Sequence, residues 1–200
     1  SICRDSTVSP NGNFDVEVAD LTIRHGVAAV GTQNAAAGGG LLVQAVGLTL
    51  AHVTFRANTA RAGGAMYVVQ SVAALDNVTF VENHANSGGA LYTGTGSFPD
   101  LEDVTFSANT AIPGTVGDGG GFGGGMYNNG SFPTLANVAF DGNTAAEAGG
   151  GMFNVASSPQ LTAVAFTANS TTASSSGSAG GGMGNSSSSP LLVRVQFIDN

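Results

Sequence analysis

The sequence predicts an all-β chain wound as a parallel β-solenoid, and three observations support this prediction. A short motif, L-x-x-V-x-F-x-x-N, recurs along the chain, and every copy but the last is followed by a glycine pair and an apolar residue. Within the motif, apolar and other residues alternate at a period of two, which is typical of strands. Glycine accounts for 31 of the 200 residues and Ser, Thr and Asn are abundant, a composition that disfavours helices.

The spacing of the motif copies indicates stacked coils. The step from Leu to Phe is always five residues and the step from Phe to Asn always three, whereas the Phe-to-Phe steps are 25, 26, 34, 26 and 31 residues. Most of this variation falls between the Asn and the next glycines, above all in Thr110–Phe122 and Ser170–Ala179. Insertions confined to one corner are typical of stacked repeats. We therefore expect about seven coils, with variable loops at one corner.

The chain divides into a short leading segment and the repeats. Residues 1–15 carry no motif, and we interpret them as an N-terminal arm or cap of the repeat domain, which covers 16–200. Val16–Ile23 alternates apolar and polar residues and is expected to form the first strand. Each later copy should supply short strands that pair with their equivalents in the next coil, ~4.8 Å away.

Two columns of identical residues should run along the solenoid. The phenylalanines are expected to point inward and stack, and the asparagines to stack at a corner with their amides hydrogen-bonded along the axis. Asparagine also tolerates the left-handed backbone that such a corner needs. The residues of these two ladders are Phe55, Phe80, Phe106, Phe140, Phe166 and Phe197, and Asn58, Asn83, Asn109, Asn143, Asn169 and Asn200.

A third column, aromatic in character, follows the glycine pairs. It contains Tyr67, Tyr92, Tyr127 and Phe153. We expect these rings to form a further ladder in the core. The alternative interpretation is a sugar-binding stripe on the surface.

The repeat resembles that of a known family. The alternation of F-x-x-N with G-G-A-[ILM] is similar to the repeat of the chlamydial polymorphic outer-membrane proteins. The fuller form, which runs here from Ser131 through Asn143 and on to Gly149–Asn154, resembles the right-handed parallel β-helix repeats of large bacterial surface and secreted proteins. The resemblance covers roughly Leu48 to Asn200, and Val16–Gly47 more faintly. It implies a right-handed coil and an exported, adhesin-like or surface-structural protein, and it carries over no catalytic residue.

Composition limits the partners and the compartment. Five Arg, no Lys and thirteen carboxylates give a net charge of −8, which disfavours nucleic acid as a partner. No stretch has the length and apolarity of a membrane span, and the chain starts at Ser1 without a signal peptide. We interpret it as a mature or excised extracellular or cell-surface chain. Cys3 is then a terminal thiol without a role or, in the alternative, part of an intermolecular disulfide.

The candidate chemical site is a group of carboxylates. Asp76 and Glu102 share a column and should lie ~5 Å apart in neighbouring coils, with Asp103 and Asp100 close by. A pectate-lyase-like enzyme would use such a group for Ca²⁺, together with a basic residue that abstracts a proton. The chain has no Lys, its Arg residues fall in other columns or coils, and its three histidines occupy three different columns. We interpret the carboxylates as a solvated acidic face, and predict no enzyme activity, cofactor or metal.

These observations favour a structural role. The last motif copy reaches Asn200 with no loop or cap after it, and an uncovered edge of a solenoid invites pairing. We expect a non-catalytic, extracellular, structural or adhesive solenoid that stacks head to tail into a surface filament through a non-closing contact. A fragment of a longer autotransporter-like adhesin passenger and a polysaccharide-binding or polysaccharide-degrading pectate-lyase-like protein are the alternatives. Any host-surface or glycan ligand should be bound at the variable loops.

Overall fold

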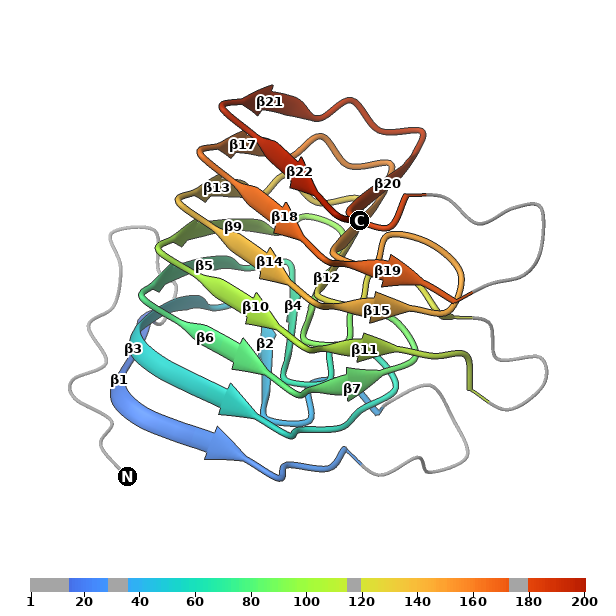
Figure 1. Ribbon diagram of the computed structural model, residues 1–200. Coiled ribbons are helices and arrows are strands. Elements are labelled where there is room, and N and C mark those ends of the chain that lie inside the picture. The colour runs from blue at the N-terminus through green and yellow to red at the C-terminus, as the bar shows by residue number, and fades with distance from the viewer. Residues whose placement is uncertain (1–14, 29–35, 115–119, 173–179) are drawn as a thin grey trace.

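The fold consists of parallel strands stacked in three sheets. The computed structural model describes residues 15–28, 36–114, 120–172 and 180–200, and every regular element in these ranges is a β-strand. The strands of successive repeats lie one above another in Figure 1, and every pair of named strands is parallel. The prediction of an all-β chain with parallel pairing is confirmed, and the arrangement is consistent with a parallel β-solenoid.

The largest sheet carries the L-x-x-V-x-F segment of each repeat. Its strand order is β21-β17-β13-β9-β5-β3-β6-β10-β14-β18-β22, and β1 pairs with β3. The long strand β3 pairs with both β5 and β6, because each later repeat bends between its Leu and its Val. These strands are β1 (Asp15–Arg24), β3 (Gly47–Arg56), β5 (Val72–Asp76), β6 (Thr79–Val81), β9 (Phe98–Glu102), β10 (Thr105–Ser107), β13 (Thr134–Ala136), β14 (Ala139–Asp141), β17 (Gln160–Thr162), β18 (Ala165–Thr167), β21 (Leu191–Val193) and β22 (Gln196–Ile198).

The other two sheets follow the asparagines and the glycine pairs. The four-stranded sheet contains β7 (His84–Ala85), β11 (Thr110–Ala111), β15 (Thr144–Ala145) and β19 (Ser170–Thr171). The six-stranded sheet contains β2 (Leu41–Gln44), β4 (Met66–Val69), β8 (Leu91–Thr93), β12 (Met126–Asn129), β16 (Met152–Val155) and β20 (Met183–Ser186). The expected first strand is present as β1 and extends by one residue at each end of Val16–Ile23.

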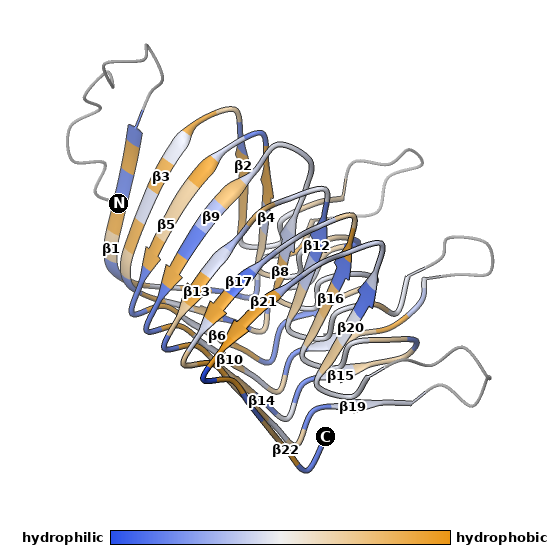
Figure 2. Ribbon diagram, turned by 90° about the horizontal axis from the view of Figure 1, so that it is seen from above, coloured by the Kyte–Doolittle hydropathy of each residue, from blue (hydrophilic) through white to orange (hydrophobic). Residues whose placement is uncertain are grey.

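Identical residues pair across neighbouring repeats. Phe80, for example, is in register with Phe55 on one side and with Phe106 on the other. Inward side chains form one continuous apolar cluster, and the residues between them face outward. Figure 2 shows this alternation as changes of hydropathy along strands that lie one behind another. None of the described residues belongs to a helix long and apolar enough to cross a membrane.

The corners of each repeat have left-handed backbone, and one expectation about them is wrong. The left-handed residue is the one before each ladder asparagine, such as Ala57, Ala108 or Gly142, with φ values of 52°, 52° and 60°. The asparagines themselves do not have positive φ. Their recurrence is therefore explained by the hydrogen bonds of the amide and not by backbone tolerance.

The glycine pairs permit close approach between repeats. Gly63 has a φ of 60°, and a Cβ on Gly64 would lie 2.2 Å from the carbonyl oxygen of Gly89 in the next repeat. Because that neighbour is backbone, it has little freedom to move aside. The glycines therefore allow the chain to turn into the six-stranded sheet.

Candidate functional site

The corner asparagines form a buried ladder of hydrogen bonds. Asn109 is fully buried, and its Oδ1 accepts hydrogen bonds from the backbone N–H and from Nδ2 of Asn83, both at 3.0 Å. Its own Nδ2 donates to the carbonyl oxygen of Phe80 at 3.0 Å and to Oδ1 of Asn143 at 2.9 Å. Each amide thus satisfies backbone groups of neighbouring repeats and the next amide as well. All six predicted asparagines take part, from Asn58 to Asn200.

The predicted phenylalanines stack as a second ladder inside the coil. In each pair of neighbouring repeats from Phe55 to Phe197, the two ring centroids lie 4.7 to 5.1 Å apart and the ring planes are within 11° of parallel. All except Phe197 in the last repeat are fully buried. The spacing follows from strands that pair in register, since identical side chains then repeat at the strand separation.

A second polar ladder lies inside the six-stranded sheet, and sequence reasoning missed it. Asn128 Nδ2 donates to Asn154 Oδ1 at 2.7 Å, and Asn154 Nδ2 donates to Asn185 Oδ1 at 2.8 Å. Thr93 donates to Asn128 Oδ1 at 2.5 Å and also bonds the hydroxyl of Ser131 at 2.6 Å. The available signal was the Asn that follows M-Y, M-F and M-G in three successive repeats.

The structure brings the candidate carboxylates together only in part. Asp76 and Glu102 are register neighbours, as expected, and both are exposed. Asp100 accepts a hydrogen bond from the hydroxyl of Thr134 in the next repeat. Asp103 follows Glu102 at the bend, where its φ is 54°. Within the described part of the chain, no group of three or more His, Cys, Asp or Glu side chains could hold a metal ion.

The tyrosines of the aromatic column lie on the outer side of the six-stranded sheet, so their expected place in the core was wrong, whereas Phe153 of the same column is buried at 9% exposure. Met66 and Val68 are buried, whereas Tyr67 between them is only partly buried, as are Tyr92 and Tyr127. Tyr67 and Tyr92 stack at 4.8 Å, and Tyr92 and Tyr127 follow at 5.0 Å.

The environment of the tyrosines disfavours the surface-stripe alternative. Stacking turns each ring face toward its neighbour, so the faces that a sugar would contact are occupied. The pKa values of Tyr67 and Tyr127 are raised, mainly by burial of the hydroxyl and to a smaller degree by the charge of the neighbouring Tyr92. Asn129 Nδ2 donates to the Tyr92 hydroxyl at 3.0 Å. The column is therefore a packed outer layer over the sheet.

The histidines lie apart from one another. His52 pairs with Asp20 at 3.5 Å, and His84 lies in β7, where burial lowers its pKa. Cys3 and residues 1–14 of the expected N-terminal arm are outside the described residues, as are 115–119 and 173–179 of the two long loops, whereas Asp15, the last residue of that arm, lies in β1. The predictions for them stay predictions.

Comparisons with protein-family models, with curated proteins and with solved structures each found no match. The family resemblance therefore rests on the repeat motif alone. The described groups supply axial hydrogen bonding and stacking, and the carboxylates supply negative charge at the surface.

Proposed function

We propose that this chain is a non-catalytic structural or adhesive module, a right-handed parallel β-helix of about seven coils that works outside the cell or on its surface. The observation that supports this most is the location of the recurring residues. The ladder phenylalanines and asparagines lie inside the coil and bind their own equivalents in the next repeat. Residues that recur for axial stacking favour a scaffold over a catalyst.

We further propose that the scaffold stacks head to tail into a filament. Leu192 and Phe197, at the β21–β22 edge, are 41% and 49% exposed, whereas Leu161 and Phe166, their equivalents one repeat earlier, are 1% and 0% exposed. A further parallel coil would bury these residues and pair the edge strands. The proposed cover is a second copy of the chain. Further repeats of a longer, autotransporter-like adhesin are the alternative cover.

A polysaccharide-active protein is the second alternative. Degradation by a lyase mechanism would need carboxylates and a basic residue that face one groove. A hollow between β3 and β9, lined by Asp15, Val72 and Phe98 among other residues, contains a carboxylate but no Arg or His among the described residues of its lining. This observation favours the structural proposal over an enzyme.

Electron microscopy of the 200-residue chain at rising concentration tests the stacking. We expect fibres with an axial repeat close to the length of one subunit. The Phe197→Glu variant should lose them because it places a charge in the contact, whereas Phe132→Glu, a matched change on the side of the coil, should keep them. Single short rods at every concentration would overturn head-to-tail stacking and favour a longer chain.

A further inference from the structure

An apolar column lies on the outside of the coil. Val72 and Phe98 begin β5 and β9, Phe132 lies two residues before β13, and the three side chains are 60%, 53% and 47% exposed. Val72 is in register with Phe98, and the rings of Phe98 and Phe132 stack with centroids 5.8 Å apart. Isolated apolar residues are ordinary on protein surfaces, whereas contiguous ones mark interaction sites. We call these three residues the outer apolar column.

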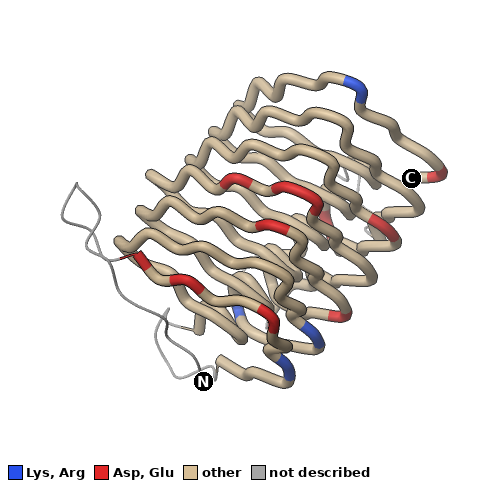
Figure 3. The backbone as a smooth tube through the Cα atoms, turned by 90° about the vertical axis from the view of Figure 1, so that its left-hand side faces the viewer, with Lys and Arg blue, Asp and Glu red and all other residues tan. Residues whose placement is uncertain are grey.

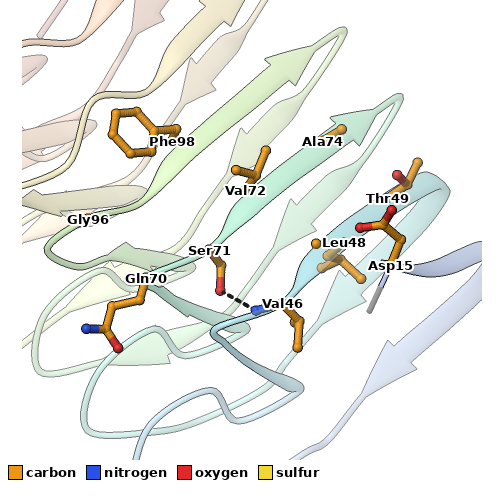
Figure 4. A pocket seen from close by; sticks show the side chains of 11 residues that line it. Asp15, Val46, Leu48, Thr49, Gln70, Ser71, Val72, Ala74, Gly96 and Phe98 are labelled. Carbon is orange, nitrogen blue, oxygen red and sulfur yellow. Dashed lines mark hydrogen bonds between the residues drawn. The ribbon is translucent and has the colours of Figure 1, made fainter. Parts of the chain in front are cut away.

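A hollow of about 500 Å³ adjoins this column. Gly47 continues the column below Val72, and a Cβ there would lie 2.1 Å from Oδ1 of Asp15. The absence of a side chain at Gly47 thus leaves space for the Asp15 carboxylate beside the outer apolar column. The side chains of Val72, Phe98 and Asp15 are drawn around this hollow in Figure 4.

Hydrogen bonds fix the backbone beneath the hollow. The Ser71 hydroxyl accepts a hydrogen bond from the Val46 N–H at 3.3 Å and donates one to the Val69 carbonyl oxygen at 2.8 Å. Ser71 is itself 3% exposed. A site held this way loses little conformational entropy when a ligand binds.

Negative charge lies beside the column on the same face. Phe98, Asp100 and Glu102 are alternate residues of β9 and all are exposed, so the two carboxylates point outward with the ring. Asp76 lies directly beside Glu102, a like-charge pairing that destabilises a sheet. The Arg56–Glu82 ion pair and the His52–Asp20 contact do not involve these groups. Figure 3 shows acidic positions on the middle coils of this face, whereas the basic positions lie toward the two ends of the stack.

We propose that the outer apolar column and its carboxylates form a docking surface for a basic segment of another protein, in which Arg or Lys residues alternate with apolar ones. The apolar side chains contact Val72, Phe98 and Phe132, and the cations face Asp15, Asp100 and Glu102. A cation between Asp76 and Glu102 relieves the repulsion that the fold otherwise tolerates. Charge complementarity of this kind speeds association and selects partners.

The charges also argue against other occupants. A second copy of this chain has no Lys and only five Arg against thirteen carboxylates, so it offers few cations to the carboxylates of this face. Nucleic acid is repelled by the same carboxylates, and a neutral glycan would leave the carboxylate pair uncompensated. The proposal goes beyond the structural role and does not require stacking, since the face lies on the side of the coil and not on its ends.

Binding of a defined peptide to the whole chain tests the proposal. The probe is a fluorescent 12-residue peptide of alternating Arg and Leu, compared by fluorescence anisotropy with a Glu–Leu peptide and a neutral β-glucan oligosaccharide of similar length. We expect binding of the Arg–Leu peptide alone, weakening as salt rises because exposed charges are screened. Equal binding of the Glu–Leu peptide, or stronger binding of the oligosaccharide, would overturn the proposal.

Matched variants separate this face from general charge attraction. Asp100→Asn with Glu102→Gln should weaken binding about tenfold, which corresponds to about 1.4 kcal/mol. The double variant Asp141→Asn with Asp199→Asn removes the same charge elsewhere on the chain and should change binding less than about twofold.

The double variant Phe98→Ser with Phe132→Ser tests the apolar part of the surface and should weaken peptide binding about tenfold by removing apolar contact. Equal weakening by both charge pairs would contradict the proposal, as would full binding by the Ser variant. Fibre formation should survive in the charge variants, so a failure here is distinct from a failure of stacking.

Discussion

The two asparagine ladders of this molecule look alike but satisfy different groups. In the corner ladder, Asn109 bonds the backbone N–H of Asn83 and the carbonyl oxygen of Phe80 as well as the neighbouring amides. In the inner ladder, Asn128 instead bonds the side chains of Thr93 and Asn154. Replacing an amide that hydrogen-bonds buried backbone N–H and C=O groups leaves those groups unpaired. An amide that hydrogen-bonds other side chains can be replaced together with these partners, which leaves no unpaired group.

The sequence of the chain reflects this difference, because one ladder keeps its residue in every repeat and the other does not. The corner ladder keeps Asn in every repeat from Asn58 to Asn200. The inner ladder column reads Val68, Thr93, Asn128, Asn154 and Asn185, so it changes from apolar to polar along the axis. The comparison predicts unequal costs for equivalent substitutions.

The largest expected effect is that of Asn109→Ala. This change leaves the Asn83 N–H and the Phe80 carbonyl oxygen buried without their side-chain partner, at about 1–3 kcal/mol each. We expect the free energy of unfolding to fall by about 3–5 kcal/mol in urea titrations followed by circular dichroism. The control is Ser107→Ala, a partly exposed neighbour, which should change it by less than about 0.5 kcal/mol. Similar values for the two variants would contradict the assignment of the corner ladder.

The inner ladder should give a smaller and non-additive effect. Asn128→Val leaves the Asn154 Oδ1 without its donor, and we expect a loss of about 1–2 kcal/mol. Adding Asn154→Val removes that unpaired group, and Asn185 Oδ1, which then loses the Asn154 donor, belongs to an exposed residue that water can reach. The double variant should therefore be no less stable than the single one, measured as a double-mutant cycle in urea. Additive losses would show that the inner ladder is as indispensable as the corner ladder.

The smallest effect concerns the left-handed residue that precedes each corner asparagine. Ala108 has a φ of 52°, and its equivalent Gly142 has a φ of 60° with no atom within 4 Å of an added Cβ. Left-handed backbone is costly for a residue with a Cβ, so Ala108→Gly should stabilise the fold and Gly142→Ala destabilise it, each by about 1 kcal/mol. Thermal unfolding of both variants should show shifts of opposite sign. Shifts of the same sign would contradict the backbone explanation.

The sequence by itself determined the parts of this protein that recur. Period-two alternation and identical residues at fixed steps are enough to predict parallel strands, the first strand and the columns of Phe and Asn, because in-register stacking places identical residues side by side. The sequence also predicted that Asp76 and Glu102 are neighbours, and the register agrees.

Only the tertiary structure decided features that depend on the side a residue faces or on unlike residues that meet. Tyr67 lies on the outer side because the buried Met66 and Val68 fix the phase of its strand. The outer column of Val72, Phe98 and Phe132 joins residues of different type that are 26 and 34 positions apart, and a search for repeated identities does not bring them together. The inner ladder was missed for a related reason, since Asn recurs in only three repeats of its column and the earlier members are Val68 and Thr93. Stacking along the axis creates these neighbours, and it exists only in the folded chain.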